Sequence, residues 1–194
     1  TVDFPYFAEN CLYIKPKVGP LMPFVFNRAQ KYAHEKLEEQ RNKTGKVRAL
    51  FLKGRQQGIS TYIGGREYHR TINIKATDTF IFSHEASASD SLFHMVKTYH
   101  ENSPQIVKPV LGKSNAKELL FPGLQSGYKV GTAGTGGLGR GKTFQNLHWS
   151  EVAYSKNCDE HSKGVMQTVS DATLLSMIKQ KIKEGQSVQR LITN

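Results

Sequence analysis

The stretch VRALFLKGRQQGIST, residues 47–61, predicts a buried strand, a glycine-containing loop and the start of a helix. VRALFL is short and almost wholly apolar, which is typical of a strand inside a sheet. After the loop, STYIGGREYHRTI has apolar side chains at helical spacing, although Gly64 and Gly65 each weaken a helix by about 1 kcal/mol. A loop between a strand and a helix N-terminus points backbone N–H groups at an anion. These residues are therefore a candidate phosphate-binding loop.

Strands and helices alternate on both sides of this loop. Asn27 can cap a helix over residues 27–40, which precedes the strand at residues 47–52. DTFIFSH, residues 78–84, predicts a second buried strand, and the apolar spacing after it predicts a helix over residues 86–100. This order predicts an α/β fold with a mostly parallel central sheet flanked by helices.

The second half of the chain predicts further strands. KELLF and SGYKVGT, on either side of a turn at PGLQ, predict a small antiparallel hairpin over residues 117–132. FQNLHWSE, residues 144–151, predicts a strand that ends in two polar residues. The Pro- and aromatic-rich residues 1–23 predict an extended N-terminal arm, and residues 24–194 predict one domain.

A second loop carries a complete phosphate-loop pattern. GGLGRGKT, residues 136–143, places Gly136, Gly141, Lys142 and Thr143 in the four fixed positions of G-x-x-x-x-G-K-[ST]. A strand is predicted directly after it, however, where the pattern needs a helix N-terminus. The first loop has the better surroundings and is the preferred candidate.

The first loop matches the phosphate-loop pattern only in part. Gly58 and Ser60 fit the late Gly and the Ser/Thr, but Ile59 stands where the pattern has its phosphate-binding Lys. Lys53 or Arg55 would have to supply the missing positive charge. The alternative is an ordinary strand-to-helix turn without a ligand.

Ser150 and Glu151 provide a second landmark, about 90 residues after the first loop. A phosphate-loop ATPase needs an acidic group at the end of a strand to orient or activate water. Glu151 fits this role, and Ser150 offers a neutral oxygen to magnesium, through a bound water. On its own, such a pair is also a common way for a strand to leave a sheet.

Composition narrows the class of partner. The 194 residues include 27 Lys and Arg against 16 Asp and Glu, a net charge of +11, which favours a polyanion such as nucleic acid over a neutral small molecule. A merely solvated basic surface is the alternative. Cys11 and Cys158 lack the spacing of a zinc site, no histidine pair has a trusted metal spacing, and no apolar stretch reaches a membrane span. We therefore expect a cytosolic protein without membrane contact.

Two motifs and the text between them resemble one family. GRQQGIST and LHWSEVAY are similar to the first and second nucleotide motifs of the large terminase subunits of tailed double-stranded DNA bacteriophages, the ATPases that drive genome packaging. SHEASASDSLFHMVK and GTAGTGGLGRGKTFQN also resemble that family, so the likeness covers residues 24–171. It implies a RecA-like P-loop NTPase fold that binds ATP with Mg²⁺ and moves double-stranded DNA into a procapsid. It further implies a portal protein and small terminase subunit as partners, a ring of subunits, and the cytoplasm of a bacterial host.

The resemblance also assigns residues. Gln30 matches the glutamine that reads the adenine edge, and Arg55 matches a loop arginine that stabilises charge during phosphoryl transfer. Arg140 and Lys142 would then contact DNA or a neighbouring subunit's nucleotide, or simply face solvent. Ser60, or Thr61 beside it, joins Ser150 as a magnesium ligand. The expected nucleotide-binding set is Gln30, Lys53, Gly54, Arg55, Gln56, Gln57, Gly58, Ile59, Ser60 and Thr61.

The chain departs from the family at three places: Ile59, Ser150 and the text after residue 171. The family's nuclease domain is not expected within this chain, so no metal-dependent DNA cleavage is predicted. A rival prediction is a prophage remnant that binds nucleic acid without catalysis, and a third is a helicase-like translocase.

Overall fold

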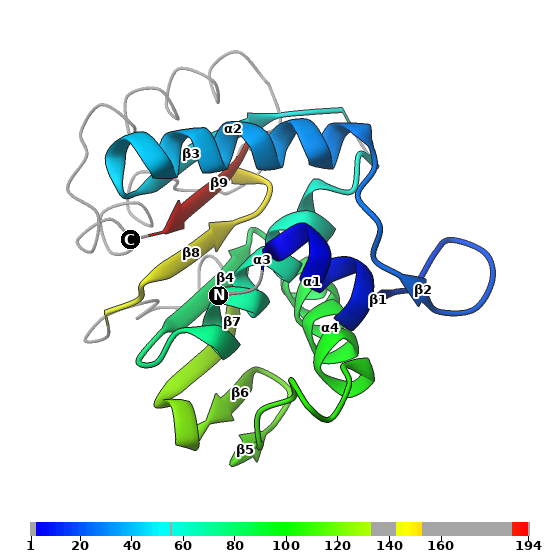
Figure 1. Cartoon of the computed structure of the whole chain (residues 1–194), viewed down its shortest axis with the longest axis vertical. Helices are drawn as coiled ribbons and strands as arrows, with labels where there is room; N and C mark the ends of the chain where they lie inside the picture. Colours follow the sequence, from blue (N-terminus) through cyan, green and yellow to red (C-terminus); the bar gives the residue numbers. More distant parts are fainter. Residues whose placement is uncertain (1–2, 55, 133–142, 153–187, 194) are drawn as a thin grey trace.

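The computed structural model describes residues 3–54, 56–132, 143–152 and 188–193, which form a mixed α/β fold around one large sheet (Figure 1). Within these residues the strand order is β3-β9-β8-β4-β7-β6-β5. The strands are β3 (Val47–Leu52), β4 (Asp78–Ser83), β5 (Lys113–Ser114), β6 (Glu118–Phe121), β7 (Ser126–Thr132), β8 (Asn146–Trp149) and β9 (Val188–Thr193).

The centre of the sheet is parallel, as the sequence predicts. β4 pairs in parallel with both β7 and β8, while β9 is antiparallel to β3 and to β8. β3, β8, β4 and β7 therefore run in one direction, and their carboxyl ends meet at one edge. The predicted hairpin is confirmed as β6 and β7, joined by a 3-10 turn at Pro122–Leu124.

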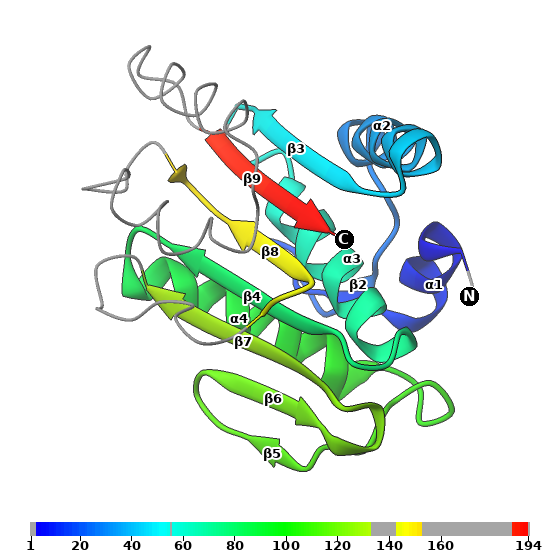
Figure 2. The same ribbon diagram turned by 90° about the vertical axis from the view of Figure 1, so that its left-hand side faces the viewer.

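Helices α3 (Ile59–Asn73) and α4 (Ala86–Asn102) cover one face of this sheet (Figure 2), and α2 (Arg28–Thr44) lies beside β3. Side chains along a strand alternate between its faces, so Ile81 of β4 joins the core under the helices, while Phe80 and Phe82 point to the other face. There Phe82 packs on Trp149 of β8 at a ring distance of 4.9 Å.

Helix α2 begins and ends as its sequence dictates. Asn27 and Gln30 form a reciprocal capping box, in which each side chain accepts a hydrogen bond from the other residue's backbone N–H. The helix continues past the predicted end at residue 40 to Thr44, because the residue that stops it is Gly45, with a φ of 71°.

The prediction of an extended N-terminal segment is wrong for residues 4–11, which form helix α1 (Phe4–Cys11). Pro5 is compatible with the first turn of a helix because that turn's N–H groups have no helical partner. Phe4, Phe7 and Ala8 share a buried face that packs toward α3. After it, only β1 (Tyr13–Ile14) and β2 (Met22–Pro23) are extended strands, and they pair with each other.

The two glycines that weaken α3 as an isolated helix have a packing role. A Cβ on Gly65 would lie 3.1 Å from the Phe24 ring and 3.3 Å from Leu12, and one on Gly64 would lie 2.9 Å from Met95 of α4. Because these glycines have no side chain, the N-terminal segment and α4 can pack closely against α3. Helix propensity does not include this stabilisation by tertiary packing.

Strand β9 is absent from the sequence-based prediction. Its letters, VQRLIT, mix polar, basic and apolar residues without a clear period of two. Its position comes from pairing on both sides, with Leu191 opposite Ala49 of β3 and opposite His148 of β8. Such long-range pairing leaves little trace in the local sequence.

Candidate functional site

The first loop lies between β3 and α3 at the carboxyl edge of the parallel strands, as predicted. Gly58 precedes the first turn of α3 with a φ of 70°, in the left-handed region that favours glycine. A Cβ there would lie 2.7 Å from Gln30 Nε2, so a larger residue does not fit without displacement. Ile59, Ser60 and Thr61 form the first turn of α3, whose N–H groups lack partners within the helix.

Helix α2 holds this loop in place through two side chains. Gln30 Nε2 donates a hydrogen bond to the Gly58 carbonyl at 2.8 Å, and Asn27 Nδ2 donates to the Gln57 carbonyl at 3.3 Å. Gln30 Oε1 also accepts from the Asn27 backbone N–H at 2.9 Å. Gln30 is only 4% exposed, so its amide works first as an internal tether between helix and loop.

Ile59 is buried, which explains why an apolar residue stands at the usual lysine position. It is 5% exposed and joins the hydrophobic core, in a groove it shares with Ala33 and Leu37 of α2. A lysine ammonium at this place would lose its hydration without a charged partner. Positive charge near the loop comes from elsewhere.

Two lysines supply that charge. Lys53 follows β3 and is half-buried, and Lys17, from the segment between β1 and β2, donates a hydrogen bond to Gln56 Oε1. The sequence identifies Lys53 as a candidate but not Lys17, because 39 residues separate Lys17 from its partner. Arg55 lies outside the described residues.

Glu151 stands at the end of β8 in a strained conformation. Its φ of 54° is uncommon for a residue with a Cβ, and such strain often accompanies functional positions. Its Oε2 lies 3.3 Å from Nδ1 of His84, which directly follows β4. Ser150 is buried, and its backbone N–H donates to the Phe82 carbonyl at 2.9 Å. The sequence does not single out His84, since only the pairing of β4 with β8 brings it beside Glu151.

The charges at this edge interact across the sheet. Burial lowers the pKa of the Lys53 ammonium, and the Glu151 carboxylate partly opposes this effect. Burial and the nearby Lys53 charge lower the pKa of His148 to about 3, so its imidazole is neutral at pH 7. His148 is buried in the sheet, and neither ring nitrogen has a hydrogen-bond partner in the described part of the chain. Lys53, His148 and Glu151 therefore share one electrostatic environment beside the loop.

An apolar groove continues from the loop between α2 and β3. Tyr32 and Ala29 line its helix side, residues 49–54 line its strand side, and Gln57 and Ile59 close it toward the loop. Tyr32 is 64% exposed, so its ring is accessible from solvent. A flat aromatic ligand has room and an apolar lining here.

The donor set at this edge suits magnesium held together with a nucleotide. Mg²⁺ prefers oxygen ligands and usually takes one or two from protein, with the rest from phosphates and water. Ser60 in the first turn of α3, and Ser150 and Glu151 after β8, offer such oxygens at this edge of the sheet. Across the described residues, no group of three or more His, Cys, Asp or Glu side chains could hold a metal by itself.

Several features considered in the sequence lie outside this site. The loop cations Arg140 and Lys142, and with them most of GGLGRGKT, lie outside the described residues. Cys11 is a free, partly buried thiol whose pKa is raised by burial. None of the helices described is long and apolar enough to cross a bilayer.

Comparison with solved structures finds a chain of similar fold. The large terminase of bacteriophage HK97 superposes with a TM-score of 0.65 at 15% sequence identity, over 94% of this chain and 41% of that one. The two chains share a fold. The fold implied by the terminase resemblance is thereby confirmed, and this chain spans about two fifths of the HK97 terminase. No protein-family model and no curated protein matches the sequence.

Proposed function

We propose that this chain is the ATP-hydrolysing motor domain of a phage-type DNA-packaging terminase. The observation that carries the proposal is the meeting of the Gly58 loop, Lys53 and the His84–Glu151 pair at one edge of a sheet with a terminase fold. A phosphate-binding loop and a carboxylate that can direct water are the two parts that ATP hydrolysis requires.

The loop residues would hold the phosphates of ATP. Backbone N–H groups from Gly58 to Thr61 and the positive end of α3 attract negative charge. Lys53 and Lys17 would supply the charge that Ile59 lacks, and Arg55 would stabilise charge that develops during phosphoryl transfer. Lys53, Gly54, Gln56 and Gln57 complete the proposed binding loop.

Glu151 would position and activate the attacking water. His84 lies 3.3 Å from its carboxylate and can hold that side chain in one orientation. When bound, Mg²⁺ would neutralise charge on the outer phosphates, and Ser60 and Ser150 are its proposed ligands, the latter through water.

The base of ATP would lie in the groove between α2 and β3. Tyr32 offers a ring for stacking, and an amide carries a second N–H and a second lone pair beyond those Gln30 already uses. Gln30 would therefore both tether the loop and favour adenine.

Double-stranded DNA is the proposed polymer that the motor moves. The net charge of +11 suits binding to a phosphate backbone, with Arg140 and Lys142 as proposed contacts to DNA or to a neighbouring subunit. A ring of subunits on a portal and procapsid, a small terminase subunit and the cytoplasm of a bacterial host complete the proposal. DNA binding should tolerate any sequence and weaken steeply with salt.

The test is magnesium-dependent ATP binding and turnover by the purified chain, with and without duplex DNA. Saturable ATP binding with DNA-stimulated turnover supports the motor. Ile59 favours one specific rival, a domain that binds nucleic acid without catalysis. DNA binding with no measurable ATP affinity in magnesium would establish that rival in place of the motor, while unwinding activity would favour a helicase-like translocase.

A further inference from the structure

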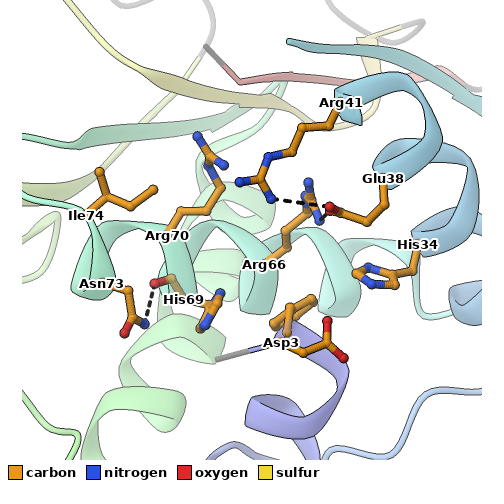
Figure 3. Close-up of a pocket in the computed structure, with 10 residues that line it drawn as sticks. Asp3, His34, Glu38, Arg41, Arg66, His69, Arg70, Asn73 and Ile74 are labelled. Atoms are coloured by element: carbon orange, nitrogen blue, oxygen red, sulfur yellow. Dashed lines mark hydrogen bonds and ion pairs between the residues drawn. The ribbon is translucent and has the colours of Figure 1, made fainter. Parts of the chain in front are cut away.

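A second pocket lies along the later half of α3, away from the phosphate loop (Figure 3). Helices α1, α2 and α3 all contribute to it. Arg66 and Arg70 lie about 10 to 17 Å along the helix from Ile59, at 1.5 Å per residue. The lining residues are Asp3, Phe4, His34, Glu38, Arg41, Arg66, His69, Arg70, Asn73 and Ile74.

The central group is a buried arginine with unused donors. Arg66 is 2% exposed, and its Nη1 donates to Glu38 Oε1 at 2.5 Å. Its Nε and Nη2 have no hydrogen-bond partner within the part of the chain that the structure describes. Buried N–H groups without an acceptor are costly, and more so on a charged group.

Two further arginines lie beside it. Arg41 Nη1 donates to the other oxygen of Glu38 at 3.2 Å, and Arg70 Nε donates to Asn146 Oδ1 at 3.1 Å. Figure 3 shows the guanidinium groups of Arg41, Arg66 and Arg70 gathered on the side of the pocket near Glu38. Burial lowers the pKa of Arg70, and the Arg66 and Arg41 charges lower it further, against the influence of Glu67 and Glu38.

The three guanidinium groups lie near two carboxyl groups, Glu38 and the fully buried Glu67, and burial raises the pKa of Glu67 to about 7. Each oxygen of Glu38 already accepts from one arginine. His34 adds no charge near pH 7, because burial and Arg66 lower its pKa. Asp3 is exposed and lies at the rim. Arg66 therefore keeps Nε and Nη2 without an acceptor among the described residues, in a pocket lined by three arginines.

We propose that this pocket binds a phosphate group at a site separate from the phosphate loop. Arginine forks bind phosphate oxygens in pairs, and the free Nε and Nη2 of Arg66 are arranged as such a fork. Arg41, about half exposed, and Arg70 can bind the remaining oxygens. The phosphate belongs either to a DNA backbone or to a small phosphorylated molecule, since the pocket's chemistry is the same for both.

The experiment titrates the full chain with inorganic phosphate in magnesium and a saturating non-hydrolysable ATP analogue, so that the loop is occupied and no phosphate is released. The test variant is Arg41→Gln with Arg70→Gln, which leaves the buried Arg66–Glu38 pair in place. The control is Lys31→Gln with Lys43→Gln, which also removes two charges, from exposed positions on the same helix as Arg41. The same proteins are then titrated with a short DNA duplex.

We expect saturable phosphate binding that weakens about tenfold or more in the arginine double variant and remains within about twofold in the control. Absence of saturable binding in the wild type, or equal losses in both variants, would overturn the proposal. DNA affinity that falls more in the arginine double variant than in the control identifies a backbone phosphate. DNA affinity can instead fall equally in the arginine double variant and in the control, while phosphate affinity falls only in the arginine double variant. In that case the ligand is a small phosphorylated compound.

This test stands apart from the proposed ATPase activity. If the chain binds no ATP, phosphate titration still reports on the arginines, because Arg41 and Arg70 lie outside the loop. A loss of ATP binding with arginine-dependent phosphate binding intact would remove the motor function and leave the second site.

Discussion

The two ends of α3 create positive potential in different ways. At its beginning, the helix dipole and the N–H groups after Gly58 face the loop, while the side chain of Ile59 is buried in the core. In its later half, Arg66 and Arg70 carry the charge themselves, and Arg41 joins them from α2. The loop end combines backbone geometry with the charges of Lys53 and Lys17, whereas the later half of the helix depends on arginine side chains.

This difference decides which changes each end tolerates. The loop end should lose function when backbone geometry changes, even with no charge altered. The arginine pocket should keep its fold but lose its ligand when exposed charges are removed. Catalysis is proposed only at the loop end, where Glu151 lies, so the largest effects are expected there.

Replacement of Glu151 by Gln should have the largest effect. An amide cannot accept the proton from water, so turnover should fall by about 10²- to 10⁴-fold while ATP affinity changes little. Steady-state hydrolysis and equilibrium binding measure the two quantities separately. Glu85→Gln is the matched control, because Glu85 Oε2 also lies near His84, at 3.8 Å, but faces solvent. Equal losses in both variants would show that Glu151 acts only through local charge.

Gly58→Val should distort the backbone of the loop before α3. A β-branched residue at a φ of 70° is strained by about 1 to 3 kcal/mol, and its Cβ would push against Gln30. We expect ATP affinity to fall by about tenfold to 100-fold, measured by calorimetry with magnesium. Circular dichroism checks that the fold remains.

Lys142→Ala serves as the comparison for Gly58→Val, because Lys142 completes the other phosphate-loop pattern. ATP affinity close to that of the wild type is expected. If alanine at 142 abolishes binding and valine at 58 does not, the nucleotide lies at GGLGRGKT and the loop assignment made here is wrong.

The fold and the strand–loop–helix unit at the candidate site could be predicted because their signals are local. A short apolar strand, a glycine at a fixed spacing and a following helix all lie within residues 47–61, and the pair at Ser150 and Glu151 follows directly on its strand. The left-handed backbone conformation at Gly58 favours glycine, so the presence of this residue in the sequence already indicates a turn there.

The features that the sequence did not predict depend on contacts between segments that are distant along the chain. His84 meets Glu151 only through strand pairing, and Lys17 reaches Gln56 across 39 residues. The residues of the arginine pocket come from three helices, which the fold brings together from separate parts of the sequence. Helix α1 was not predicted because its proline and aromatic residues favour extended structure locally. In the folded chain, burial of Phe4 and Phe7 outweighs that local preference.

Gln30→Leu should distinguish two proposed roles of Gln30, which are to hold the loop in place and to recognise adenine. Loss of the bond to the Gly58 carbonyl weakens ATP and GTP alike, whereas loss of adenine recognition weakens ATP alone. We expect ATP affinity to fall about tenfold further than GTP affinity. Asn27→Ala is the control, since it removes a loop tether without an adenine contact and should affect both nucleotides equally. A parallel loss in Gln30→Leu would assign Gln30 to the tether only.

The smallest expected effect concerns Glu67, which lies on α3 between Arg66 and Arg70. It is fully buried, neither carboxylate oxygen has a hydrogen-bond partner among the described residues, and burial raises its pKa to about 7 against the opposing influence of Arg70 and Arg66. The folded protein therefore holds this proton to a higher pH than the unfolded chain, and stability falls as pH rises from about 4.5 toward 7. Glu67→Gln cannot lose a proton, so its melting temperature should exceed that of the wild type by a few degrees at pH 8, with a smaller difference at pH 5. The exposed Glu35→Gln should show no such pH dependence. If the Glu67→Gln difference is the same at both pH values, the buried carboxyl group is already ionised at pH 5, and the centre of α3 carries a charge that balances the arginines beside it.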